Sequence, residues 1–168
     1  MKTIVGIIGG HQHNTTERAL LLAERVGAEL AHRGFTIICG GYSGIMEAAC
    51  RGCKGAGGTT IGVLKGNDPA AANPYIDYVI ATSMDLASNH IIIWSSSVII
   101  AFDGMYGTLT EIGLALDTGK PLINLGHHRL LNVTNVDSNR FAHFEGYELT
   151  QVHKAIDCVE AMIKVTNV

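Results

Sequence analysis

A short apolar run that leads through a glycine-containing turn into a helix occurs more than once in this sequence and limits the folds open to it. The clearest example is residues 97–111, SVIIAFDGMYGTLTE. Residues 98–102 are apolar throughout, which is typical of a strand buried on both faces, and a helix is expected from Thr108. The first N–H groups of a helix have no partner within it, and the helix dipole is positive there, so this segment predicts an anion-binding site.

Strands and helices are expected to alternate along the chain. Apolar runs and turn residues predict strands at 3–8, 35–39, 59–64, 78–81, 98–102 and 122–125. Helical periodicity and end signals predict one helix from a cap at Asn14 to about Gly34, and others at 44–54, 85–94, 108–118 and 150–164. This alternation predicts an α/β fold, a doubly wound parallel sheet with helices on both faces.

Three segments need a further argument. Asn14 and Glu17 have the spacing of a capping box, which predicts that Asn14 caps the first helix. Residues 85–94 contain three successive isoleucines that would suit a strand, but parallel strands need a crossover between them, so a helix is expected. Residues 126–148 are the least periodic part of the chain, and no element is assigned there.

Size, charge and cysteine content narrow the class of protein. The 168 residues are predicted to form a single domain, 1–168, and a net charge of −3 without a run of lysines or arginines argues against nucleic-acid binding. No apolar run approaches the roughly 20 residues that span a membrane, so no membrane contact is expected. The four cysteines are irregularly spaced and do not resemble a disulfide framework, which predicts a reduced, cytoplasmic setting.

The candidate ligand-binding residues follow the strands, because ligands of doubly wound sheets bind at the strands' carboxyl ends. The loop residues expected there to contact a phosphate-bearing ligand are Gly9, Gly10, His11, Gly40, Gly41, Ser43, Gly44, Lys65, Asp103, Gly104, Met105, Tyr106, Gly107 and Thr108. Residues 40–44 match neither the dinucleotide fingerprint nor a P-loop, so a tight turn without a ligand is the alternative there. Lys65 and Arg51 are the candidate cations.

Glu111 and Asp103 each have more than one interpretation. Glu111 could close a capping box with Thr108, or it could face the ligand and orient a sugar hydroxyl or a water. A carboxylate beside a phosphate costs roughly 1 kcal/mol or more. Asp103 is therefore expected to point away from the ligand, to accept hydrogen bonds from its N–H or hydroxyl groups, or to form a turn with its own backbone.

Cysteine and histidine pairs are interpreted as structural, and no metal site is expected. Cys50 and Cys53 lie in the later turns of the second expected helix, away from the N-terminus that would favour a thiolate, and one pair supplies too few ligands for zinc. The histidine pairs that follow strands are His11 and His13, and His127 and His128. Both pairs would lie on the ligand side of the sheet and could bind a metal or an oxyanion. No carboxylate has a matching spacing, so they are interpreted as loop residues.

Four segments are specific when taken together. They read GGYSGIMEAACRG, ANPYIDYVI, SNHIIIW and GMYGTLTEIGLAL, the last followed by GKPLI. In combination they resemble the Lonely Guy family, long mislabelled as lysine decarboxylases, over roughly residues 3–126. The resemblance is closest to the short subgroup that includes the molybdenum cofactor carrier proteins. It implies a Rossmann-like fold, ligand binding at the carboxyl ends of the strands, and a homodimer or larger assembly.

The resemblance also shows where this sequence departs from the family's enzymes, which cut the N-glycosidic bond of cytokinin nucleoside 5′-monophosphates. Their signature is PGGxGTxxE with an arginine upstream. Here Glu111 is retained, but Asp103 stands at the proline position and Met105 at that of the second glycine. The arginine position falls on Ser88, followed by Asn89, which joins the candidate ligand contacts. Ribosyl hydrolysis passes through a cationic sugar, and the enzyme must also hold the phosphate, for which one carboxylate without a cation is poorly suited.

These departures predict a carrier in preference to an enzyme. The expected function is non-catalytic binding and carrying of the molybdenum cofactor by a homodimer or tetramer, with molybdoenzymes or cofactor-synthesis proteins as partners. The main alternative is a nucleoside 5′-monophosphate phosphoribohydrolase with a divergent site, in which Glu111 is the acid–base or ribose-orienting group. A nucleotide-sensing module without turnover is a further alternative.

Overall fold

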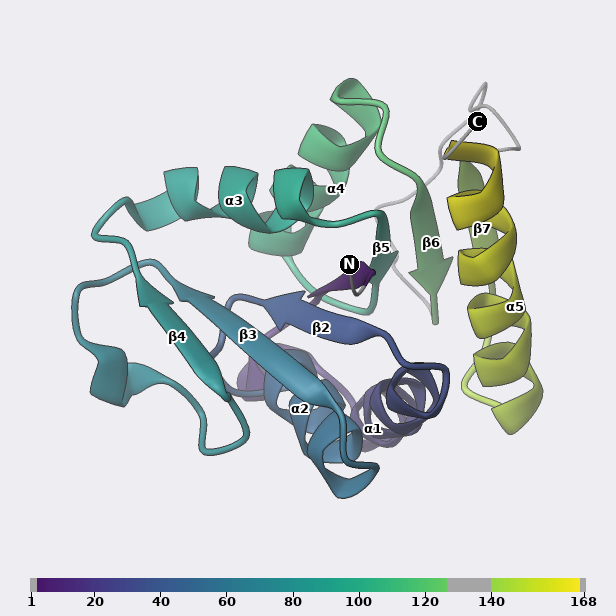
Figure 1. Cartoon of the computed structure of the whole chain (residues 1–168), viewed down its shortest axis with the longest axis horizontal. Coiled ribbons are helices and arrows are strands. Elements are labelled where there is room, and N and C mark those ends of the chain that lie inside the picture. The colour runs from purple at the N-terminus through teal and green to yellow at the C-terminus, as the bar shows by residue number, and fades with distance from the viewer. Residues whose placement is uncertain (1–2, 127–139, 167–168) are drawn as a thin grey trace.

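The computed structural model describes residues 3–126 and 140–166, and its centre is a sheet of seven parallel strands (Figure 1). The strands are β1 (Ile4–Ile8), β2 (Thr36–Cys39), β3 (Thr59–Leu64), β4 (Tyr78–Ala81), β5 (Val98–Ala101), β6 (Leu122–Leu125) and β7 (Phe141–Phe144). Their order across the sheet is β4-β3-β2-β1-β5-β6-β7, and each adjacent pair is parallel. The predicted Rossmann-like α/β fold is confirmed.

Helices cover both faces of the sheet, as Figure 1 shows. They are α1 (Glu17–His32), α2 (Ile45–Gly55), α3 (Ser88–Ser95), α4 (Tyr106–Asp117) and α5 (Leu149–Thr166), with short 3₁₀ turns η1 (Gln12–Asn14), η2 (Pro69–Ala71) and η3 (Asp85–Ala87). One apolar core joins α1, α2 and α5 to the sheet, and a second joins α3 and α4 to its other face. Among the described helices, none is long and apolar enough to cross a membrane.

The direction in which strands are added reverses beside β1. The chain adds β2, β3 and β4 on one side of β1 and then places β5, β6 and β7 on the other. Connections from β1 and β5 therefore leave the sheet toward opposite faces, to α1 and to α4. In open α/β sheets the crevice beyond such a reversal is where ligands bind.

The central strand β5 shows why the sequence reads as an uninterrupted apolar run. Val98 and Ile100 belong to the core beneath α1, α2 and α5, whereas Ile99 and Ala101 belong to the core beneath α3 and α4. Both faces of the strand are buried, so polar residues do not alternate with apolar ones along it.

Two expectations about local structure are wrong. Asn14 does not cap α1, because Gln12–Asn14 form the turn η1 and the helix begins later, at Glu17. Thr16 is the cap, and its side-chain oxygen accepts from the N–H of Ala19 at 3.2 Å. The segment 126–148, which was given no element, contains β7 beside β6.

The crossing of α1 and α2 is unusually close and fixes the position of α2. A Cβ on Gly27 of α1 would overlap the carbonyl oxygen of Ala49, and one on Gly52 of α2 would overlap the carbonyl oxygen of Glu24. Each glycine therefore allows the backbone of the facing helix to approach. Because α2 follows directly from the glycine loop after β2, this contact also positions that loop.

Gly52→Ala is expected to lower the free energy of unfolding by about 1–3 kcal/mol, because the new methyl group forces the two helix backbones apart. Urea denaturation followed by circular dichroism measures the change. Gly55→Ala in the same helix is the matched control, since a Cβ there meets no atom within 4 Å. It is expected to leave stability unchanged or to raise it by up to about 1 kcal/mol. Equal stability of Gly52→Ala and the wild type would contradict the close crossing.

Candidate functional site

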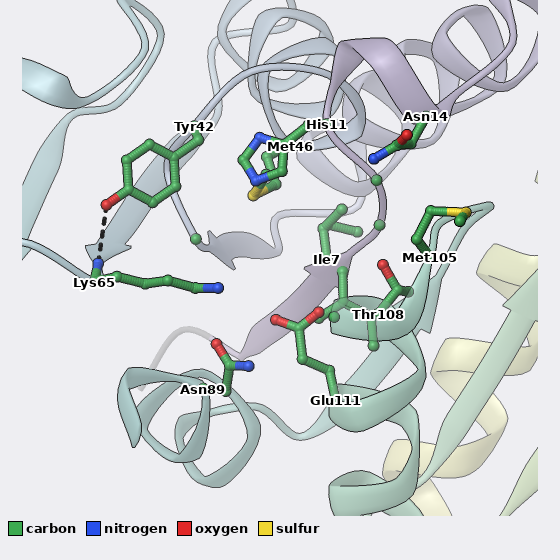
Figure 2. A pocket seen from close by; sticks show the side chains of 15 residues that line it. Ile7, His11, Asn14, Tyr42, Met46, Lys65, Asn89, Met105, Thr108 and Glu111 are labelled. Carbon is green, nitrogen blue, oxygen red and sulfur yellow. Dashed lines mark hydrogen bonds between the residues drawn. The ribbon is translucent and has the colours of Figure 1, made fainter. Parts of the chain in front are cut away.

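A pocket opens at the carboxyl ends of β1, β2 and β3, facing the N-terminal parts of α3 and α4 (Figure 2). It is lined by Ile7, Ile8, Gly9, Gly10, His11, Asn14, Gly40, Tyr42, Met46, Lys65, Asn89, Met105, Gly107, Thr108 and Glu111. Its volume is about 110 Å³. Pockets that enclose a whole drug-sized ligand measure roughly 300–1,000 Å³. A ligand the size of a nucleotide would therefore place one end here and extend through the open side.

The structure brings most of the sequence-predicted site residues together. Those that line the pocket are Gly9, Gly10, His11, Gly40, Lys65, Asn89, Met105, Gly107, Thr108 and Glu111. Those that do not line it are Gly41, Ser43, Gly44, Asp103, Gly104 and Tyr106. Sequence reasoning missed Ile7, Ile8, Asn14, Tyr42 and Met46. Of these, Tyr42 carried the one available signal, an aromatic residue between the glycines of a candidate ligand loop.

Several glycines of the loops allow protein segments to meet. Gly44 has φ of +79°, and a Cβ there would overlap the carbonyl oxygen of Gly10. A Cβ on Gly104 would overlap the hydroxyl of Thr108. The N–H of Gly10 donates to the carbonyl oxygen of Asp103 at 2.8 Å. These contacts bring the loops after β1, β2 and β5 to one point.

The first turn of α4 presents backbone N–H groups to the pocket. The helix begins at Tyr106, and its N-cap, Met105, makes no side-chain capping hydrogen bond. Of the two interpretations of Glu111, the capping box with Thr108 is wrong, because Thr108 already lies within the first turn. Gly107 and Thr108 line the pocket. Uncapped N–H groups and the positive end of the helix dipole make this position suited to an oxyanion.

Lys65 brings a positive charge to the pocket. Its backbone N–H donates to the hydroxyl of Tyr42 at 3.1 Å, which fixes the loop after β3, and its side chain points into the pocket (Figure 2). Among the lining residues that the structure describes, it is the one lysine or arginine. Arg51, the other candidate cation, does not line the pocket and forms a two-point ion pair with Glu24 of α1.

Positions 88 and 89 differ sharply in what they face. Ser88 is 0% exposed, and its hydroxyl donates to the carbonyl oxygen of Asp85 at 2.6 Å. Asn89 is 4% exposed and lines the pocket, and its side-chain amide makes no hydrogen bond with any described residue. Its amide group is accessible from the pocket, so Asn89 offers a donor and an acceptor to a ligand.

Glu111 is the acidic group of the pocket. Its side chain extends from the second turn of α4 toward Asn89 and Lys65 (Figure 2). Burial raises the pKa of Glu111 to about 7, and the nearby charge of Lys65 offsets part of that rise. The group therefore changes protonation state near neutral pH.

Asp103, one of the expected ligand contacts, does not line the pocket, and of its three interpretations the one in which it points away from a ligand agrees with this position. Its carboxylate accepts a hydrogen bond from the hydroxyl of Tyr147, in the connection between β7 and α5. A Cβ on Gly126 would lie 2.8 Å from the same carboxylate. Asp103 therefore joins the loop after β5 to the C-terminal part of the chain and directs its negative charge away from the anion site.

The cysteines and histidines give no metal site within the described residues, where no group of three potential ligands is found. Cys50 and Cys53 are buried in the core, which confirms their interpretation as packing residues. His11 lines the pocket, and its ring lies 6.0 Å from that of Tyr42. The expectation for His127 and His128 concerns residues outside the described ranges.

Comparisons with known proteins agree with the fold. Residues 2–158 match the sequence model of the SLOG cluster4 family. An uncharacterised protein of Archaeoglobus fulgidus is 38% identical over 121 residues, which cover 72% of this chain and 78% of the relative. The molybdenum cofactor carrier protein MCP from Chlamydomonas reinhardtii superposes with a TM-score of 0.82 and 32% identity, covering 98% of this chain and 99% of that one. The molybdenum cofactor binding protein from the phototrophic bacterium Rippkaea orientalis superposes with a TM-score of 0.72 and 30% identity, covering 96% of this chain and 87% of that one.

Glu111→Gln is expected to stabilise the protein above neutral pH. The pKa of Glu111 is raised from 4.5 to about 7 in the folded state, so the folded state keeps a proton that the unfolded state releases between these values. The stability from this proton is complete below the unfolded pKa and is lost as the pH rises through the folded one. A neutral glutamine avoids that loss, which amounts to up to about 3 kcal/mol at pH 8.

Urea unfolding at pH 8 and at pH 4.5 measures this difference, which should nearly vanish at the lower pH. Glu17→Gln is the control, because Glu17 is exposed at the start of α1, and no rise in stability at pH 8 is expected from it. A Glu111→Gln protein no more stable than the wild type at pH 8 would contradict the burial of a carboxylate in the pocket.

Proposed function

Because the chain belongs to the SLOG cluster4 family, which is similar to the Lonely Guy proteins, we propose that it binds and carries the molybdenum cofactor without cleaving a nucleotide. The observation that carries the proposal is a pocket that keeps the anion-binding start of α4 but has no arginine among its lining residues in the described part of the chain. The position where the family's enzymes have that arginine is Ser88, which is fully buried and bonded to Asp85. Similarity to the molybdenum cofactor carrier protein of Chlamydomonas reinhardtii supports the same choice of ligand.

The pocket fits one end of such a cofactor, its phosphate. The N–H groups of Gly107 and Thr108 and the ammonium group of Lys65 would bind the phosphate oxygens, which are the ligands that such donors favour. The amide of Asn89 would pair with a donor or an acceptor farther along the ligand. When bound, the cofactor supplies redox chemistry to the enzyme that receives it, and this chain's residues bind and orient it.

One observation favours the alternative of a phosphoribohydrolase. A carboxyl group whose pKa is about 7 is suited to general acid–base catalysis near neutral pH, and Glu111 has this property. Cleavage of an N-glycosidic bond would need Glu111 to orient the ribose or an attacking water. Among the described lining residues, Lys65 alone would then neutralise the phosphate, and the carboxylate of Glu111 alone would stabilise the cationic sugar.

Lys65→Met is expected to weaken cofactor binding about tenfold, because it removes roughly 1–2 kcal/mol of attraction for the phosphate. Anaerobic titration with isolated molybdenum cofactor, followed by transfer to an apo-molybdoenzyme, measures the effect. Lys154→Met is the matched control, since Lys154 lies on the exposed side of α5 and does not line the pocket. The proposal would be overturned if the wild type bound the cofactor no more tightly than an unrelated Rossmann protein does.

The same preparations decide between carrier and hydrolase. Incubation with AMP and with isopentenyl-AMP should release no free base from the wild type. Release of base that is abolished by Glu111→Ala would establish the hydrolase instead, because that variant removes the one carboxyl group in the described pocket.

We further propose that the chain forms a homodimer or tetramer and exchanges its cofactor with molybdoenzymes or cofactor-synthesis proteins. Large apolar side chains are exposed on β4 and around the start and end of α3, namely Tyr78, Ile80, Met84, Leu86 and Trp94. From residue 78 to residue 95 the sequence has one acidic residue, Asp85, and no lysine or arginine. A largely apolar surface of this kind, with few charged groups, is suited to contact with a second copy of itself.

Sedimentation velocity is expected to give a mass of two or four times 17.9 kDa for the wild type. The double variant Ile80→Lys with Leu86→Lys should sediment as a monomer, because association would bury two unpaired charges. Leu21→Lys, at an equally exposed leucine on the opposite face of the sheet, should leave the mass unchanged. A monomeric wild type at micromolar concentration would overturn the proposed assembly.

A further inference from the structure

Glu111 and the proposed anion site lie on the same side of α4. Glu111 follows Thr108 by three residues, so the two side chains share a helix face, and helical side chains lean toward the N-terminus. The carboxyl group therefore extends toward the first turn, where the N–H groups would bind an anion. Figure 2 shows it inside the pocket with Thr108 on one side and Asn89 and Lys65 opposite.

The surroundings of Glu111 do little to stabilise a negative charge. No described residue donates a hydrogen bond to its carboxyl group, and burial raises its pKa to about 7. The groups that face the pocket from the neighbouring elements are Lys65 after β3, Asn89 on α3, His11 after β1, Tyr42 after β2, and Met46 on α2. Of these, Lys65 is the one whose charge offsets part of the rise in the pKa of Glu111.

A bound oxyanion makes the ionised carboxylate still less favourable. With Glu111 ionised, the single charge of Lys65 is shared between two negative groups, and the carboxylate repels the ligand. With Glu111 protonated, the whole charge of Lys65 is available to the ligand, and the carboxyl O–H becomes a further donor. Both changes favour uptake of the anion with Glu111 in its neutral form.

We propose that Glu111 binds the ligand as a neutral carboxylic acid whose O–H donates a hydrogen bond to an oxygen of the bound oxyanion, so that above neutral pH each anion enters together with about one proton from solvent, and the anion is released as the pH rises. This deepens the proposed function and rests on it, because it requires an anionic ligand in this pocket. Glu111 then selects for oxyanions and makes their release sensitive to pH. No covalent bond changes, and the proton returns to water when the anion leaves.

Inorganic sulfate is the probe, because it carries two negative charges at every pH from 6 to 9 and contributes no titration of its own. The dissociation constant of the wild type, followed by NMR titration, should rise about tenfold from pH 6 to pH 8, as one coupled proton with a pKa of about 7 requires. Calorimetry in two buffers of different ionisation enthalpy should show uptake of about 0.9 proton per sulfate at pH 8.

Three variants separate Glu111 from the other groups. Glu111→Gln keeps a donor at the same place and should bind sulfate with a dissociation constant that changes less than about twofold over this pH range, with no proton uptake. Lys65→Met should bind more weakly and keep a pH dependence that moves to higher pH, because the charge of Lys65 lowers the pKa of Glu111. His11→Asn should also keep it, because the proton belongs to Glu111.

Sulfate binding by the wild type that does not vary with pH, or a pH dependence that survives in Glu111→Gln, would overturn the inference and leave the proposed anion pocket standing. Absence of sulfate binding at every pH, in the wild type and in Glu111→Gln alike, would overturn the anion pocket together with the inference.

Discussion

The arrangement of the pocket depends on the backbone of Gly10. Its N–H donates to the carbonyl oxygen of Asp103 at 2.8 Å, and its carbonyl oxygen accepts from the N–H of Ile45 at 3.1 Å. One residue thus joins the ends of β1 and β5 to the start of α2. A Cβ at this position would lie 2.9 Å from the side chain of Thr15 and 3.2 Å from the backbone of Gly104. A side chain at this position would crowd Thr15 and the loop after β5, and glycine leaves room for that loop, which leads into α4.

Near Gly10, one negative side chain is kept out of the pocket and one positive side chain is brought into it. Asp103, which would repel an anion, turns toward Tyr147 and Gly126 and leaves the pocket. Lys65 is brought in by the bond between its backbone N–H and Tyr42, a contact that uses no part of its charge. The pocket therefore contains one full positive charge and one carboxyl group of variable charge among its described residues. Binding of an anion is decided by the balance between these two.

Periodicity revealed the sheet because both faces of its central strands are buried, so strands such as β5 are apolar without interruption. The sequence signal for the start of α1 was ambiguous, because two neighbouring residues could cap the helix. Asn14 and Thr16 are both good caps, and only the turn η1 decides between them. The edge strand β7 is short and only partly buried, which leaves no clear pattern in Phe141–Phe144.

The site was predictable in its composition but not in its geometry. Glycines after strands indicated ligand loops, and Gly9 and Gly107 line the pocket, whereas Gly44 and Gly104 instead let protein segments approach each other. Sequence alone does not distinguish these two uses, because each requires the absence of a side chain. That Asp103 turns to Tyr147, 44 residues away, likewise follows from tertiary contacts alone.

Ser88 and Asn89 are neighbours in the sequence, but only Asn89 lines the pocket, and this contrast affects which substitutions each position can accept. An arginine at position 88 would replace a fully buried serine and lose the hydrogen bond to Asp85, so the new charge would need partners that the serine does not use. A single substitution there would therefore cost stability before it could add a cation to the pocket. Position 89, which already lines the pocket, carries no such cost of entry, so the two neighbouring positions tolerate change differently.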